Sequence, residues 1–316
     1  MRRLYMAALT LLAAALLCTA CHKQEQNVAP GKLKIVTTLF PLYDFAKHIG
    51  GDKVEVRLLL PPGTEPHSFE PKPDDIVRVN RADLFIYTNR YMEPWAAQIV
   101  SGLDKGKPLV IDTSNGVTLL KTTGNEPQSH EGEGHGHGEG GMDPHIWLDF
   151  SNARIMVDNV LAGLVAGDPA NRAYYEANAA SYKAQLADLD QRFRSGLSPC
   201  AKRVFLHGGH FAFGYLAQRY GLRYQSAYAV NADAEPTPAR LADLIKQMRA
   251  NGLQHVYTEE LLNPRVAETI ARETGATLLM LHGAHNISKE DFDRGVTFTA
   301  LMEQNLKNLR TGLQCR

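Results

Sequence analysis

Short runs of apolar, often β-branched residues alternate with amphipathic stretches along most of the chain. In the first third, residues 34–38 and 54–60 predict strands, and residues 40–49 between them predict a helix that Gly50-Gly51 ends. Strands are also expected at 84–88 and 110–112, with a helix over 74–81. Strands that alternate with helices indicate a parallel sheet covered on both faces.

The last third of the chain repeats this order of elements. Strands are predicted at 203–206, 255–258 and 277–281, and helices at 211–220 and 238–250. The segment from Asp74 to Thr88 resembles that from Ala242 to Thr258, since each reads as an amphipathic helix, a polar turn and a strand ending in Tyr-Thr. The pattern therefore predicts two lobes of one architecture.

A long helix is expected between the lobes. Residues 169–197 follow Asp168, contain no Pro after Pro169 and no Gly before Gly196, and are rich in Ala, Leu, Glu, Lys, Gln and Arg. We predict an α/β fold with a parallel, helix-flanked sheet in each lobe and one long rigid helix joining them. The expected limits are 32–168 for the first lobe, 169–198 for the linking helix and 199–316 for the second lobe.

Composition narrows the class of protein. The 34 basic and 34 acidic residues give a formal net charge of zero. A neutral chain lacks the excess positive charge that binds a phosphate backbone, which argues against a nucleic-acid-binding protein. Hydrophobic content of 44% with 22% charged residues is typical of a globular protein rather than a disordered or fibrous one. The 12 histidines are the unusual feature.

The N-terminus reads as an export signal. Two arginines precede a run of about 17 uncharged residues, rich in Leu and Ala, so residues 1–20 are predicted to be a signal peptide. Cys18-Thr19-Ala20-Cys21 resembles a bacterial lipobox, which makes Cys21 the expected lipidation site and 21–31 a tether. A plain cleaved signal and an uncleaved anchor are the alternatives. Export to an oxidising compartment favours a disulfide between Cys200 and Cys315 over two free thiols.

One segment is low in complexity. Residues 122–141 are rich in Gly and Glu and contain His130, His135 and His137. Such a segment cannot bury a core, and His-rich tracts bind metals loosely, so we expect a mobile, metal-binding loop. The alternative is a solvated linker.

The remaining histidines of interest follow predicted strands or prolines. Loops at the carboxyl ends of parallel strands are where α/β proteins bind ligands, and imidazole suits zinc and its late first-row neighbours. Taken singly, each is more typical of an ordinary polar loop; their shared position predicts a site. The candidates are His67, His145, His210, His282 and His285.

Three motifs resemble one family, the metal-binding proteins and lipoproteins of zinc and manganese ABC importers. They are Pro-His-Ser-Phe-Glu-Pro around His67, Asp-Pro-His-Ile-Trp-Leu-Asp around His145, and His-Phe-Ala-Phe-Gly-Tyr-Leu from His210. The resemblance runs from about Lys34 to the C-terminus. It implies metal in a cleft between the lobes, with His67, His145 and His210 as ligands. Manganese-preferring members have Glu in place of His210, so the resemblance favours Zn²⁺.

The fourth ligand departs from the family pattern. Many relatives have Asp just after the last strand, where this chain has His282, which is our predicted fourth ligand. His285, Glu259 and water are alternatives, and His207 has no assigned role. The resemblance implies an extracytoplasmic, monomeric zinc carrier that is bound to the membrane through lipid on Cys21 and delivers its ion to a permease with its ATPase.

Other functions remain as alternatives. They are a manganese or iron carrier, a metal-binding adhesin or zinc buffer, and a metallohydrolase. Gly-x-Ser-x-Gly is missing, and Gly134 interrupts His-Glu-x-x-His after His130, so neither a lipase-type hydrolase nor a zinc protease is expected. The chain is therefore predicted not to be an enzyme.

Overall fold

The computed structural model describes residues 31–103, 106–122, 141–230 and 235–316. Residues Leu33–Arg316 form one compact unit that contains both lobes. The predicted signal peptide, Cys21, the tether up to residue 30 and the His-rich loop between 123 and 140 lie outside the described residues and stay predictions. Within the described ranges, none of the helices combines the length and hydrophobicity needed to cross a bilayer.

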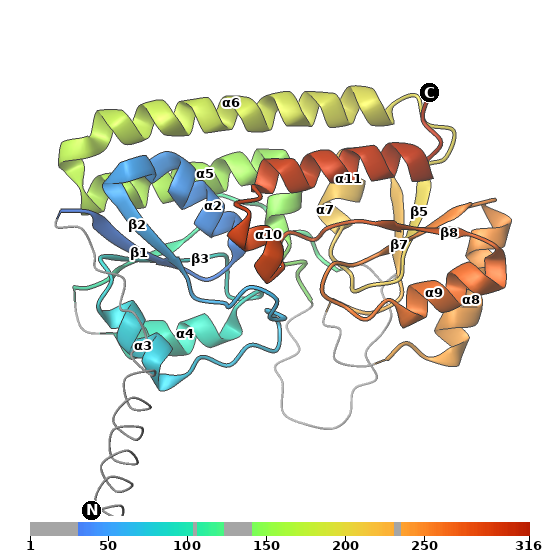
Figure 1. Cartoon of the computed structure of the whole chain (residues 1–316), viewed down its shortest axis with the longest axis horizontal. Coiled ribbons are helices and arrows are strands. Elements are labelled where there is room, and N and C mark those ends of the chain that lie inside the picture. The colour runs from blue at the N-terminus through green and yellow to red at the C-terminus, as the bar shows by residue number, and fades with distance from the viewer. Residues whose placement is uncertain (1–30, 104–105, 123–140, 231–234) are drawn as a thin grey trace, which may run out of the picture. The chain divides into compact units, whose positions relative to one another are not determined.

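The first lobe is built on a sheet of four parallel strands in the order β2-β1-β3-β4. Side chains alternate between its faces, so Ile35 packs toward one helical layer and Val36 toward the other. In Figure 1, α2 and α5 cover one face of the sheet, and α3 and α4 cover the other. The strands are β1 (Leu33–Thr37), β2 (Val54–Leu58), β3 (Leu84–Tyr87) and β4 (Leu109–Asp112), and the helices are α2 (Phe40–Gly50), α3 (Pro73–Asn80), α4 (Pro94–Ser101) and α5 (Phe150–Gly167).

The second lobe repeats this topology with strand order β6-β5-β7-β8. The fold class predicted from the sequence, two similar lobes with parallel sheets flanked by helices, is therefore confirmed. The strands are β5 (Val204–His207), β6 (Arg223–Ser226), β7 (His255–Thr258) and β8 (Thr277–Met280). The helices are α7 (Gly214–Arg219), α8 (Pro238–Ala250), α9 (Arg265–Thr274), α10 (Lys289–Asp293) and α11 (Phe298–Gly312).

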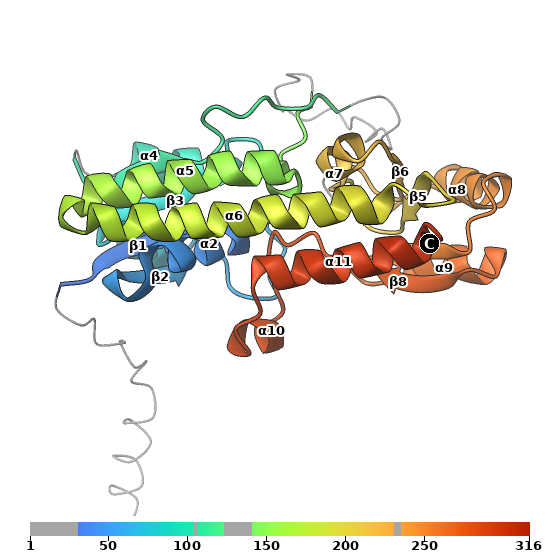
Figure 2. The same cartoon turned by 90° about the horizontal axis from the view of Figure 1, so that it is seen from above.

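The long helix α6 (Arg172–Leu197) joins the two lobes, after a 3-10 turn at Pro169–Asn171. Figure 2 shows it running beside α5 of the first lobe and on toward α11 of the second. Its buried side chains, spaced three or four residues apart, form one stripe: Tyr175, Ala179, Tyr182, Leu186, Leu189, Phe193 and Leu197. These residues belong to a single hydrophobic cluster that contains side chains of both lobes, so a continuous core connects the sheets.

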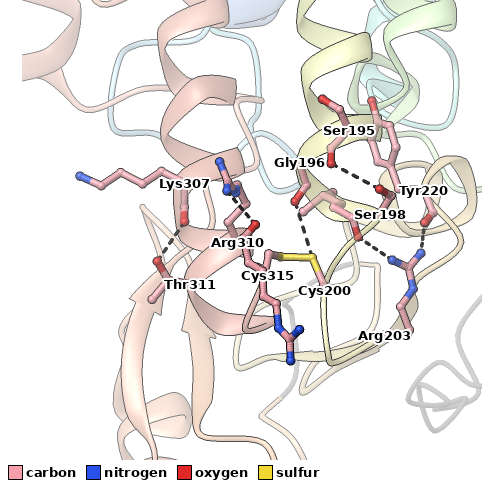
Figure 3. Close-up of a disulfide and its surroundings, with 12 residues drawn as sticks. Ser195, Gly196, Ser198, Cys200, Arg203, Tyr220, Lys307, Arg310, Thr311 and Cys315 are labelled. Carbon is pink, nitrogen blue, oxygen red and sulfur yellow. Dashed lines mark hydrogen bonds between the residues drawn. A yellow bond between two sulfur atoms is a disulfide. The ribbon is translucent and has the colours of Figure 1, made fainter.

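The predicted disulfide between Cys200 and Cys315 is present (Figure 3). It connects the segment after α6 with the segment after α11. Backbone hydrogen bonds from Ala201 to Gln314 (3.3 Å) and from Lys202 to Leu313 (3.0 Å) continue the contact. The C-terminus is thus fixed to the end of the linking helix.

Replacing both cysteines (C200S/C315S) is expected to lower the free energy of unfolding by about 2–4 kcal/mol. The covalent link closes a loop of 115 residues and restricts the unfolded chain. Urea denaturation of the oxidised protein and the double variant measures the difference, with dithiothreitol-treated wild type as a control. Equal midpoints for oxidised wild type and variant would contradict the stabilising role.

Candidate metal centre

Three histidines from loops far apart in sequence meet between the two sheets. His67 lies between β2 and α3, His145 immediately precedes the 3-10 turn Ile146–Leu148, and His210 follows β5. Their ring centroids are 5.4 Å (His67–His145), 5.4 Å (His67–His210) and 5.1 Å (His145–His210) apart. One donor atom from each lies within 4.8 Å of the others. We call these three residues the histidine trio.

Two ring nitrogens of the trio are spaced like ligands of a tetrahedral metal. Nε2 of His145 and Nε2 of His210 are 3.1 Å apart. Nitrogens bound to one tetrahedral zinc at about 2.0–2.1 Å are separated by roughly 3.3 Å. Nε2 of His67 is buried and has no hydrogen-bond partner among the described residues. A divalent ion would give all three nitrogens a common partner.

Carboxylates lie behind two of the three rings. Nδ1 of His145 is 2.8 Å from Oδ1 of Asp143, which also accepts the backbone N–H of His145 (3.0 Å). Nδ1 of His210 is 2.6 Å from Oε1 of Glu259, and the other oxygen of Glu259 accepts the backbone N–H of His210 (3.0 Å). A carboxylate at Nδ1 favours the tautomer whose Nε2 lone pair is free to bind a metal.

Burial keeps the imidazoles of His67 and His210 in their uncharged form. Desolvation, reinforced by the neighbouring imidazoles, holds the pKa of His67 well below its usual range and lowers the pKa of His210 to about 3. The neutral ring is the form that binds a metal, so protons do not compete at these two residues near neutral pH.

A second group of donors adjoins the trio and shares His210 with it. Donor atoms of His210, Glu259 and His285 lie within 4.8 Å of one another. The ring of His285 is fully buried, 5.2 Å from that of His210 and 6.4 Å from that of His145. Neither of its nitrogens has a hydrogen-bond partner among the described residues. His285 and Glu259, two alternatives for the fourth ligand, therefore both lie beside the trio.

Glu259 carries an electrostatic cost in this position. Burial and the charge of the adjacent Glu260 raise the pKa of Glu259 to about 8. A divalent cation held by the trio would favour the ionised carboxylate and offset that cost.

The structure does not bring His282 into either donor group within the described part of the chain. Its Nδ1 accepts the backbone N–H of Ala284 (2.9 Å) and lies 3.2 Å from Oε1 of Glu260. Its backbone N–H and C=O are both bound by Asn305 at 2.8 Å. His282 is thus engaged in local contacts of the second lobe.

His207 lies next to the backbone of His210 and is not one of the three histidines of the trio. It is the last residue of β5, and its Nδ1 lies 3.3 Å from the backbone carbonyl of His210. Its ring packs edge-on against Phe213, with centroids 5.0 Å apart.

Sequence reasoning named Glu259 only as a possible ligand and missed Asp143 behind the ring of His145. Asp143 was visible two residues before His145, in the motif that identified that histidine, but its role was not recognised. Glu65 was also missed: its Oε1 accepts the backbone N–H of His67 (3.1 Å), and burial raises its pKa to about 7. Its other carboxylate oxygen is buried without a hydrogen-bond partner in the described residues.

Comparisons with known proteins relate the chain to zinc-uptake proteins. A model of the family described as "ZnuA: Zinc-uptake complex component A periplasmic" matches residues 35–312. The chain is 38% identical over 302 residues to the high-affinity zinc uptake system protein ZnuA of Bacillus subtilis, with 94% of each chain covered. It is 37% identical over 297 residues to the zinc-binding lipoprotein AdcA of Streptococcus pneumoniae; the match covers 94% of this chain but 58% of AdcA.

Solved structures support the same relation. The crystal structure of the Zn(II)-bound ZnuA-like domain of Streptococcus pneumoniae AdcA is similar to this chain, with a TM-score of 0.75 and 35% identity. The similarity covers 90% of this chain and 99% of that domain.

Asp143→Asn is expected to weaken divalent-metal binding by about 10-fold or more, because His145 loses the charged partner that orients its ring. Competition with a chromophoric chelator measures the affinity. Asp112→Asn is the matched control, since Asp112 also accepts hydrogen bonds at a strand end, from Tyr87 and Ser114. Equal losses in the two variants would contradict an orienting role for Asp143.

Proposed function

Because the chain belongs to the ZnuA family of periplasmic zinc-uptake components, we propose that His67, His145 and His210 are the ligands of the zinc ion it carries. The chain is the zinc-binding component of an ABC uptake system that works outside the cytoplasm, and it is a binding protein rather than an enzyme. Zinc is its cargo.

One observation carries the ligand assignment. Two buried imidazole nitrogens, one from each lobe, face each other at 3.1 Å, and a third from His67 completes the group. Three imidazole nitrogens that converge in a buried place are a donor set suited to zinc. The carboxylates of Asp143 and Glu259 orient two of the rings from behind.

For the fourth position we propose His285 in place of His282. His285 is buried next to His210, its two ring nitrogens have no hydrogen-bond partner among the described residues, and its Nε2 lies 3.9 Å from a carboxylate oxygen of Glu259 and of Glu260. His282, predicted from the sequence, has its Nδ1 occupied by Ala284 and Glu260. Glu259 lies as near, but its Oε2 accepts the backbone N–H of His210 (3.0 Å) and its Oε1 lies 2.6 Å from Nδ1 of the same residue, behind the ring.

We also propose how the protein is held at the membrane and how zinc reaches the permease. Lipid on Cys21 holds the monomer at the membrane, and the His-rich loop raises the local zinc concentration. A permease with its ATPase takes the ion from the trio. The placement of His145 three residues after Met142 supports a role for the loop, because Met142 pairs with Lys121 at the base of the segment 122–141.

Zinc titration of the purified full-length protein with its His→Ala variants tests the ligand set. Zinc at a hundred times the dissociation constant is expected to raise the free energy of unfolding by about 2.7 kcal/mol, and H210A should lose most of that gain. H285A should lose more than H282A, measured by thermal unfolding and chelator competition. Full zinc stabilisation of H210A would overturn the trio; a larger loss in H282A than in H285A would restore His282.

A further inference from the structure

A short segment of the second lobe crosses to the first lobe beside the histidine trio. We call residues 283–287 the crossing segment. Its backbone carbonyls accept three hydrogen bonds from the first lobe. The carbonyl of Gly283 accepts from Nε1 of Trp147 (2.8 Å), that of His285 from the N–H of Phe40 (3.2 Å), and that of Ile287 from the N–H of Gly63 (2.8 Å). The crossing segment therefore contacts the chain near His145 and the loop before His67.

The side chain of Asn286 in this segment hydrogen-bonds to the first lobe. It is fully buried, and its Nδ2 donates to the carbonyls of Pro61 (2.8 Å) and Thr64 (2.6 Å). Its Oδ1 accepts the backbone N–H of Ile287 (2.8 Å). Both protons of the amide are used across the lobe boundary, and its oxygen is used within its own segment.

The two acceptor carbonyls belong to the loop that carries His67. Pro61 and Thr64 lie six and three residues before that ligand, and Glu65 binds the backbone N–H of His67 itself. The loop lies between β2 and α3, outside regular secondary structure. Hydrogen bonds to Asn286 therefore fix backbone that no sheet or helix ladder fixes.

We propose that Asn286 is a positioning residue for zinc binding, which holds the loop of residues 61–67 against the second lobe so that His67 meets His145 and His210. The proposal rests on the trio being the zinc site. Asn286 itself touches no metal; it acts by fixing the place of a ligand, in the way that partners behind a metal ligand commonly do. Loss of Asn286 leaves two carbonyls without their donor and frees His67 to leave the ion.

A double-mutant cycle between Asn286 and His67 separates this role from a purely structural one. The variants are N286A, H67A and N286A/H67A of the full-length protein, each titrated with zinc against a chelator. If Asn286 acts through His67, N286A weakens zinc binding by about 10-fold or more in the wild-type background. The same substitution weakens it by less than about twofold once His67 is absent.

Asn159 offers a matched control. Its Nδ2 also donates to two loop carbonyls, those of Thr113 (2.9 Å) and Asn115 (2.8 Å), but it lies wholly within the first lobe. N159A is expected to leave zinc affinity unchanged in both backgrounds. Thermal unfolding of the metal-free proteins reports any general loss of stability. If N286A does not fold, N286D replaces it, because it keeps the size of the side chain but places a carboxylate against the carbonyls.

A kinetic and a spectroscopic readout complete the test. N286A should release zinc faster in a chelator chase, and its Co(II)-substituted form should show an altered ligand-field spectrum, as expected when one imidazole leaves the metal. Equal losses of affinity from N286A with and without His67, or an unchanged Co(II) spectrum, would overturn the proposal. A wild-type protein whose zinc affinity does not depend on His67 or His210 would instead overturn the proposed zinc site.

Discussion

Two ring nitrogens held 3.1 Å apart, Nε2 of His145 and Nε2 of His210, are the contact on which the proposed site depends. A carboxylate oxygen lies near each Nδ1 atom, and in the tautomer that carries its proton at Nδ1 each ring presents the Nε2 lone pair to a metal. The fold brings them together because each histidine follows ordered backbone of its own lobe. His210 follows strand β5, and His145 follows the β-bridge between Lys121 and Met142. The proposed zinc site would therefore use a pair of nitrogens that the fold has already brought together.

The frame around this contact restricts large movements of the lobes. Helix α6 contributes an unbroken apolar stripe to a core shared by both lobes, and the disulfide ties the end of that helix to the C-terminus. Burial of one large apolar side chain contributes about 1.5–3 kcal/mol, so separating the lobes along the stripe is costly. The loop of residues 61–67 and the crossing segment lie outside the helices and strands.

Much of this fold is predictable because its signals are local. Short β-branched runs gave seven of the eight described strands, and a stretch almost free of Gly and Pro gave α6. Strand β6 was missed because Arg-Tyr-Gln-Ser lacks an apolar run, and its pairing with β5 is what makes it a strand. Helix α7 begins at Gly214 rather than 211, since Phe211 to Phe213 belong to the turn that carries His210. The trio could be proposed from motifs. Its surroundings could not, because Glu259 hydrogen-bonds to His210, 49 positions away, and Asn286 hydrogen-bonds to Pro61, more than 200 positions away.

The choice between His282 and His285 shows where sequence reasoning ends. Both follow β8, and no periodicity distinguishes them. Ala284 between them adopts a left-handed backbone conformation with φ of 60°, and the two rings on either side of it lie in different surroundings. His282 meets Glu260, whereas His285 lies beside His210. A site with four imidazoles and its carboxylates held behind the rings selects for borderline ions such as zinc. Direct carboxylate ligation would shift that preference toward harder ions such as manganese. In the proposed site, with His285 as the fourth ligand, the conformation at Ala284 bears on selectivity, because the rings of His282 and His285 on either side of it lie in different surroundings.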